Sequence, residues 1–214
     1  SPRGGGNDPW ESSPARGSRP LLNPDEASAL VQFYSGKVAD LVGVEAQVFR
    51  LRRDAKVAAT AALLFRRFYL SNSVMIHDPK AIMVAAAFLA TKVEDCMADV
   101  RYMEEGTKLM QAPVSIPEIL RAEINLINGI NCELLCYHPY KTVLAYTEDL
   151  RTFLKTKQGS RLAAFPDGKL RPVAGEDLRP MHDEARRIVD DAIVSDVPLL
   201  YSPGQVELAA MMVA

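Results

Sequence analysis

Two cysteines and a histidine lie close together in the sequence, at Cys132, Cys136 and His138. Thiolate and imidazole groups bind zinc, so this spacing raises the question of a metal site. A structural zinc site takes four ligands, usually as two closely spaced pairs. No second pair accompanies these residues, and the remaining cysteine, Cys96, is distant in the sequence. We therefore expect buried or idle thiols, with no metal and no cofactor.

The other residue types that could perform catalysis are scattered. His77, His138 and His182 each lie at or beside an expected helix start, where capping or surface exposure accounts for them. The sequence contains no recognisable Ser/His/Asp order, glycine-rich phosphate loop or pair of catalytic carboxylates. It therefore predicts a protein that is not an enzyme.

Two charged residues interrupt apolar helical stripes. Lys92 lies four residues after Phe88, and Glu123 lies four residues from both Ile119 and Ile127. Residues four apart share a helix face, so both charges continue apolar faces, where an unpaired charge is costly. One interpretation is that Lys92 keeps its ammonium in water while Glu123 sits at the edge of its stripe. The other is that the two charges emerge side by side and face a partner protein. Periodicity alone leaves both open.

A basic cluster lies between residues 50 and 67, with six basic residues against the single acid Asp54. Its members are Arg50, Arg52, Arg53, Lys56, Arg66 and Arg67. The cluster fits a solvated face, a contact to a phosphorylated loop of a partner, or a nucleic-acid surface. The whole chain has a net charge of −2, which argues against generic binding to nucleic acid or to a membrane surface.

These residues must be positioned by helices, because the chain from Asn23 onward has helical spacing with well-marked starts. Asn23-Pro24 and Asp78-Pro79 place a capping side chain before a proline, and Ser115-Ile-Pro-Glu118 is a capping box. The expected helices begin near Asn23, Asp54, Asp78, Ser115, Pro139, Met181 and Ser202. No stretch alternates like a strand over a useful length, so the predicted fold class is all-α.

Glycine and proline divide the chain into units. Residues 1–20 are rich in proline, glycine and serine, which predicts disorder, and Ser13-Pro14 is a candidate proline-directed phosphorylation site. Residues 156–179 predict a linker. We therefore expect one helical unit over residues 21–155 and the start of a second over residues 180–214.

The composition is that of an ordinary globular protein. Of the 214 residues, 48% are hydrophobic and 24% are charged, and there are three cysteines, which is too few for a disulfide framework. The longest apolar run, at residues 81–90, is too short to cross a bilayer. No charged-then-apolar leader is recognisable, so we expect a soluble intracellular domain.

Several segments resemble the cyclin box. They are Phe65–Met75, His77–Met83, Ala87–Asp95, Ile119–Ile124 and Tyr137–Tyr140. The similarity extends over about residues 20–214, with the order and spacing of the helices preserved. The resemblance implies a cyclin-box helical bundle of two five-helix repeats, the first of them complete and the second continuing beyond Ala214.

Within the cyclins, two phrases, residues 68–75 and 196–205, are most similar to the cyclin H group, and the second is closest to plant-type members. Cys132 and the Tyr137–Tyr140 phrase are similar to the cyclin C group. The first helix, over residues 29–36, lacks the Met-Arg-Ala-Ile-Leu docking patch of the cell-cycle cyclins. Recruitment of substrates by that route is therefore not expected.

The resemblance implies a regulatory subunit that binds and activates a cyclin-dependent kinase in a CDK-activating kinase of the transcription factor IIH type. Such a subunit acts in the nucleus, on the cell cycle and on RNA polymerase II transcription, and an assembly factor is a further implied partner. Lys92 and Glu123 match the lysine and glutamate with which cyclins grip the kinase, and Val93 and Ile127 would pack at that interface.

Two alternatives stay open at the level of sequence. One is a cyclin C-like subunit of the Mediator kinase module. The other is a transcription factor with cyclin repeats that binds DNA through the basic cluster, although direct nucleic-acid binding is the less expected outcome.

Overall fold

The computed structural model describes residues 21–159 and 173–214. Within these two ranges the regular structure is helical and contains no strand, which confirms the all-α prediction. The expectations for residues 1–20, including the Ser13-Pro14 site, and for most of the predicted linker lie outside the described residues.

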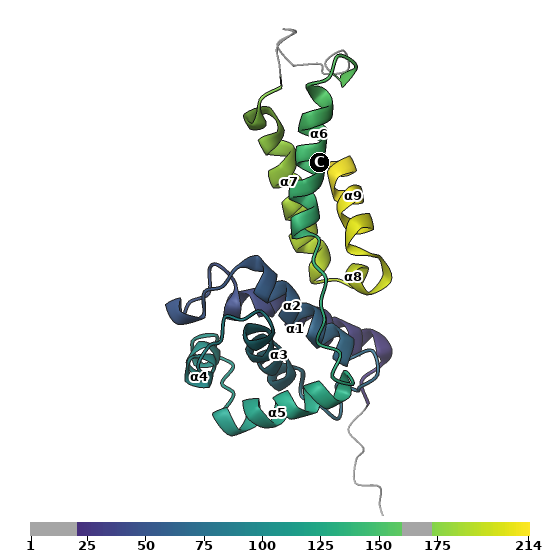
Figure 1. Ribbon diagram of the computed structural model, residues 1–214. Coiled ribbons are helices and arrows are strands. Elements are labelled where there is room, and N and C mark those ends of the chain that lie inside the picture. The colour runs from purple at the N-terminus through teal and green to yellow at the C-terminus, as the bar shows by residue number, and fades with distance from the viewer. Residues whose placement is uncertain (1–20, 160–172) are drawn as a thin grey trace, which may run out of the picture.

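The first bundle contains five α-helices and a short 3-10 helix, and Figure 1 shows them gathered in one body. They are α1 (Pro24–Val42), η1 (Phe49–Leu51), α2 (Ala55–Phe68), α3 (Pro79–Val93), α4 (Val100–Leu109) and α5 (Ile116–Gly129). Helix α3 lies at the centre and is buried continuously from Ile82 to Thr91. Its apolar character on nearly all sides explains this position, because such a helix must be surrounded by others.

Capping hydrogen bonds confirm the predicted helix starts at Asn23 and Ser115, whereas the helix predicted to begin near Met181 begins at Gly175. The Glu26 backbone N–H donates to the Asn23 side chain at 2.8 Å, and the Asn23 N–H donates back to the Glu26 carboxylate at 2.9 Å. The Ser115 N–H donates to the Glu118 carboxylate at 2.8 Å. These bonds satisfy backbone donors that have no partner within their own helix.

Helix α4 was not predicted. Its N-cap is Asp99, whose carboxylate accepts from the Arg101 backbone N–H at 2.9 Å. Its buried residues are Met103, Gly106 and Thr107, of which only Met103 is a large apolar residue. Val100, Tyr102 and Met110 also pack against the core, but the helix has only ten residues, so its apolar pattern is too short to stand out in the sequence.

The second group of helices contains α6 (Tyr140–Leu154), α7 (Gly175–Ile193), α8 (Val197–Leu200) and α9 (Pro203–Val213). Helix α6 packs against α7 and α9, and Figure 1 shows it standing outside the first bundle. The structure thus differs from the predicted division, which placed this helix in the unit 21–155. Helical spacing finds a helix but does not reveal which neighbours cover its face.

The predicted linker 156–179 also overlaps α7, which begins at Gly175 and continues through Pro180. The start is capped, because the Ala174 N–H donates to the Asp177 carboxylate at 2.8 Å. Pro180 is only the sixth residue of the helix, so its missing N–H removes a single bond near the end of the ladder. Gly175 and Pro180 suggested a linker at this point, but the helix forms because its first turn is capped.

Gly129, at the end of α5, lies against the buried ring of Phe68. A Cβ atom at this position would come within 2.3 Å of Phe68 Cε2. We expect Gly129→Ala to lower the free energy of unfolding by about 1–3 kcal/mol through overpacking, measured by urea denaturation. Gly36, inside α1, has no atom within 4 Å of the corresponding position, so Gly36→Ala is the matched control and should stabilise the protein. Equal stability of the two variants would contradict the close packing at Phe68.

Candidate functional site

Lys92 and Glu123 form an ion pair between the last turn of α3 and the middle of α5. The Lys92 Nζ donates to Glu123 Oε1 at 2.6 Å and to Oε2 at 2.9 Å. The two side chains differ in exposure, at 35% for Lys92 and 10% for Glu123. The two interrupted apolar stripes therefore meet, and each charge supplies the partner that the other needs.

The lysine is held by more than the carboxylate. Its Nζ lies 4.0 Å from the centroid of the Phe88 ring, one turn earlier on α3. An ammonium over an aromatic face is attracted by the negative face of the ring, and a cation in the last turn of a helix is favoured by the helix dipole. Three effects thus fix one ammonium at the surface of the bundle.

The four residues predicted for the site do not have the same exposure. Val93 and Ile127 are half-buried and pack against the core of the bundle. Leu120 and Ile124, which were not predicted, are exposed by 43% and 61%. They lie four residues apart on α5 and flank Glu123, so they share one side of the helix. Their spacing relative to Glu123 was visible in the sequence, but their exposure was not.

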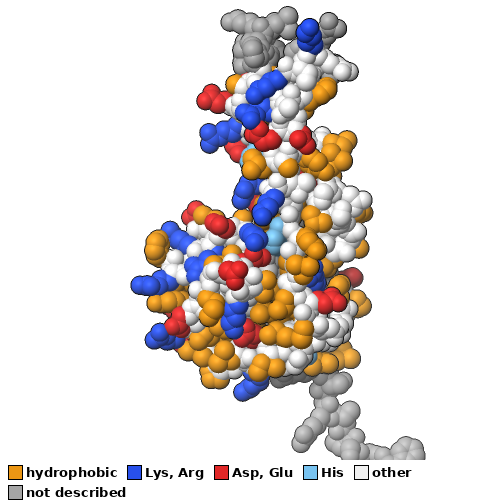
Figure 2. Space-filling model, in the orientation of Figure 1, with side chains coloured by type: hydrophobic (Ala, Val, Ile, Leu, Met, Phe, Trp, Pro, Cys, Tyr) orange, Lys and Arg blue, Asp and Glu red, His pale blue; other side chains and the backbone are white. Residues whose placement is uncertain are grey.

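These residues define a surface that we call the α3–α5 face: Lys92, Glu123, Leu120 and Ile124. It combines a hydrogen-bonded charge pair with two exposed apolar side chains. Figure 2 shows hydrophobic side chains spread over the lower body of the molecule, which α1 to α5 form. A partly buried ion pair beside exposed apolar side chains is suited to a specific contact with another protein.

A second polar cluster joins α2, the end of α3 and the connection between α5 and α6. The Thr60 hydroxyl donates to Glu94 Oε1 at 2.5 Å, and His138 Nε2 lies 2.8 Å from the same hydroxyl oxygen. Lys56 completes the cluster as an ion pair with Glu94. Burial lowers the pKa of His138, so the imidazole is neutral at physiological pH. Burial alone would raise the pKa of Glu94, but hydrogen bonds from Lys56 and Thr60 lower it.

His138, which we considered as a metal ligand from the sequence, instead contacts Thr60 and helps to join α2 to the connection between α5 and α6. Cys136 lies near another group, with its Sγ 3.6 Å from the Arg67 guanidinium. No group of three or more histidine, cysteine, aspartate or glutamate side chains in residues 21–159 and 173–214 could hold a metal ion. Across those same ranges no helix has the length and apolar character needed to cross a membrane.

The basic cluster is engaged in contacts within the chain. Arg52 and Arg53 donate to the carbonyls of Ala46 and Cys96, each at 3.0 Å. The Arg50 guanidinium lies over the ring of Tyr102. Arg67 donates to a carbonyl between α5 and α6, Lys56 pairs with Glu94, and Arg66 donates to the carbonyl at the end of α7. The guanidinium groups therefore tie loops to helices, which weakens the interpretation of the cluster as a free nucleic-acid surface.

The chain matches two families of known domains. The cyclin N-terminal domain matches residues 41–135, and the cyclin C-terminal domain matches residues 138–214. The two matches meet in the connection between α5 and α6, where the helices of the first bundle end.

Individual relatives match almost the whole chain. Cyclin-H1-1 of Arabidopsis thaliana is 27% identical over 90% of this chain and 50% of its own length. A chain in the CAK complex of Chaetomium thermophilum bound to ATP-gamma-S is 25% identical, with a TM-score of 0.70, over 91% of this chain and 54% of that one.

A chain in the yeast TFIIK (Kin28/Ccl1/Tfb3) complex is 30% identical, with a TM-score of 0.69, over 88% of this chain and 72% of that one. The chain spans about half the length of the curated relatives it matches. The two domain matches and the fold that this chain shares with the chains in the solved complexes show that it belongs to the cyclin family, with cyclin H among its relatives.

Proposed function

We propose that this protein is a regulatory subunit that binds and activates a cyclin-dependent kinase in an assembly of the CDK-activating kinase or TFIIK type. The single observation that carries the proposal is the Lys92–Glu123 pair, hydrogen-bonded at 2.6 Å and 2.9 Å. The likeness to chains in the CAK and TFIIK complexes supports the same assignment. We further propose that the protein acts in the nucleus, in cell-cycle control and in transcription by RNA polymerase II.

In this proposal the protein performs no chemistry. Cyclins are regulatory subunits, and the reaction belongs to the kinase. A protein kinase is active when the lysine of its third strand pairs with the glutamate of its αC helix. A binding partner shifts that equilibrium only as far as it binds the active state better than the inactive one. A shift from 1:99 to 99:1 requires about 5.5 kcal/mol of differential binding.

The α3–α5 face supplies the means for this shift. Leu120 and Ile124 present apolar surface that a partner would cover, and such burial provides most of the binding free energy. The charge pair sets the position of the partner on this face, because its remaining hydrogen bonds can form only in defined directions. Val93 and Ile127 are half-buried against the core, and their exposed parts would pack at the same interface.

The proposal is tested with the purified chain and a panel of cyclin-dependent kinases. Immobilised chain should retain a kinase of the CDK-activating type, and the complex should phosphorylate an activation-loop substrate at a rate far above that of the kinase alone. A folded chain that stimulates none of the kinases would contradict the proposal. Retention of duplex DNA with a steep salt dependence, in place of a kinase, would favour the DNA-binding alternative.

A further inference from the structure

The first bundle contacts the second group of helices mainly through α2, which touches α7 and α8. On the α2 side, the apolar part of this contact is made by small side chains. Ala55, Ala58, Ala59 and Ala62 of α2 line a cavity of about 220 Å³ that also borders Ile193 of α7. Methyl groups make fewer dispersion contacts than larger side chains, so they define the angle between the two parts less sharply.

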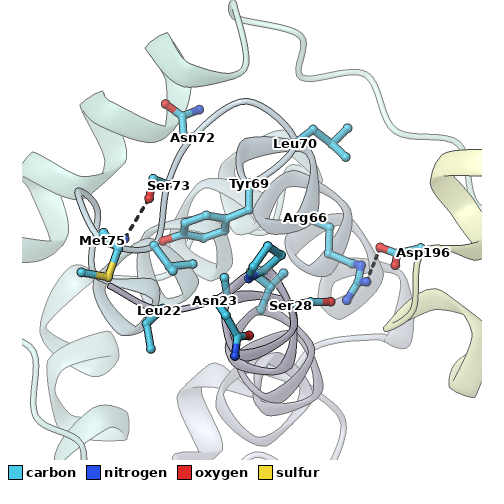
Figure 3. Close-up of a pocket in the computed structure, with 14 residues that line it drawn as sticks. Leu22, Asn23, Ser28, Arg66, Tyr69, Leu70, Asn72, Ser73, Met75 and Asp196 are labelled. Atoms are coloured by element: carbon cyan, nitrogen blue, oxygen red, sulfur yellow. Dashed lines mark hydrogen bonds and ion pairs between the residues drawn. The ribbon is translucent and has the colours of Figure 1, made fainter. Parts of the chain in front are cut away.

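A single guanidinium bridges the two parts beside this cavity. Arg66 of α2 is only 5% exposed. Its Nη1 donates to the Gln32 side chain of α1 at 2.9 Å and to the Val194 carbonyl at 2.8 Å. Its Nη2 forms an ion pair with Asp196, which Figure 3 shows reaching Arg66 from the second group. Helix α1 and the segment 194–196 therefore both bond to one side chain of α2.

Both the Arg66 donors and their acceptors have fixed directions. Val194 is the C-cap of α7, so its carbonyl lies at the negative end of a helix, where a cation is favoured. A guanidinium presents its donors in a rigid planar fork, which fixes the directions of several acceptors at once. The burial of Arg66 makes this pairing obligatory, since a buried charge without partners is costly.

Asp196 is the accessible half of the pair. Its side chain is 66% exposed, and it lies at the edge of a cavity of about 370 Å³ that Arg66, Ser28 and Tyr69 also line (Figure 3). Asp196 can therefore be replaced without opening the core. Without Asp196, the Arg66 guanidinium would still have the Gln32 and Val194 acceptors.

We propose that Arg66 is a positioning residue that sets the orientation of the second group of helices on the first bundle. We call Arg66, Gln32, Val194 and Asp196 the α2 latch. The alanine-lined contact leaves the angle between the two parts weakly defined, and the α2 latch selects one angle. The proposal concerns the free protein and does not depend on the proposed kinase partner.

The test measures a distance between the two parts in the full chain. Spin labels are attached through noncanonical amino acids at the exposed positions Glu105 of α4 and Arg187 of α7, and the distance is measured by pulsed electron resonance. The unchanged protein should give one narrow distribution. Asp196→Ala and Arg66→Lys should each broaden the distribution and shift its mean, because neither variant retains all the bonds of the α2 latch.

The matched control is Asp191→Ala, an exposed aspartate of α7, which should leave the distribution unchanged. Circular dichroism confirms that each variant is folded, and if Arg66→Lys does not fold, Asp196→Ala decides the outcome. A distribution as narrow as that of the unchanged protein in the folded variants would overturn the proposal. This result would leave the proposed kinase binding untouched, because no kinase is present.

Discussion

Replacing Glu123 with alanine is expected to weaken binding to a cyclin-dependent kinase by about 2–5 kcal/mol, which is roughly a 30-fold loss of affinity or more. The carboxylate is 10% exposed and receives both hydrogen bonds of Lys92. Its removal leaves the ammonium without its counter-charge at a surface that binding would desolvate further. Isothermal titration calorimetry of the kinase with the unchanged and variant chains measures the loss of affinity directly.

A matched control uses a carboxylate away from the α3–α5 face. Glu105 is exposed on α4, so Glu105→Ala should leave kinase affinity nearly unchanged. A double-mutant cycle with Lys92→Met then isolates the coupling between the two charges. A loss below about 0.5 kcal/mol for Glu123→Ala, the level of an ordinary exposed pair, would argue against a role for the pair in binding.

Replacing Glu207 with glutamine is expected to stabilise the protein at alkaline pH. Glu207 lies on α9 and is fully buried, and neither of its carboxylate oxygens has a hydrogen-bond partner among the described residues. Burial raises the pKa of this carboxyl to about 7, an effect that the nearby Thr142 side chain partly opposes. The ionised form is therefore disfavoured in the folded state relative to the unfolded chain.

The sign of the pH dependence follows from proton binding. Between pH 4.5 and about 7 the folded state holds a proton that the unfolded state has released, so stability falls as the pH rises. Above about pH 7 the full cost is present. We expect Glu207→Gln to raise the free energy of unfolding by on the order of 2 kcal/mol at pH 8.5, allowing for solvent screening.

The gain should shrink towards zero near pH 4, where the carboxyl is protonated in both states. Urea denaturation at the two pH values measures the difference. Glu105→Gln, at an exposed position, is the control and should show little dependence on pH. An equal effect of Glu207→Gln at both pH values would show that packing, and not ionisation, determines the change.

Much of the first bundle was predictable because its signals are local. Asn23, Asp78 and Ser115 precede their helices by one residue, and a cap acts within a single turn. The same locality applies to Lys92 and Glu123, which break apolar stripes on their own helices. Their pairing was not derivable from periodicity, because two faces meet only when the angle between α3 and α5 is known.

The features that were missed depend on contacts between distant parts of the chain. Helix α6 belongs with α7 and α9 because their faces cover one another, although it follows α5 directly in the sequence. Arg66 was interpreted as one member of a basic cluster, whereas its acceptors, Val194 and Asp196, lie about 130 residues further along. A count of neighbouring charges cannot identify a partner at that separation.

The row of alanines along α2 also means that mutation can alter the contact between the first bundle and the second group of helices. Enlarging Ala58 or Ala62, which both line the 220 Å³ cavity, would add contacts across it and change the preferred angle between α2 and α7 according to the size of the new side chain. Natural sequence drift at two methyl groups would therefore tilt one half of the molecule against the other in small steps. A cyclin built in this way can change the angle between its two parts while the α3–α5 face, which lies on other helices, stays unchanged.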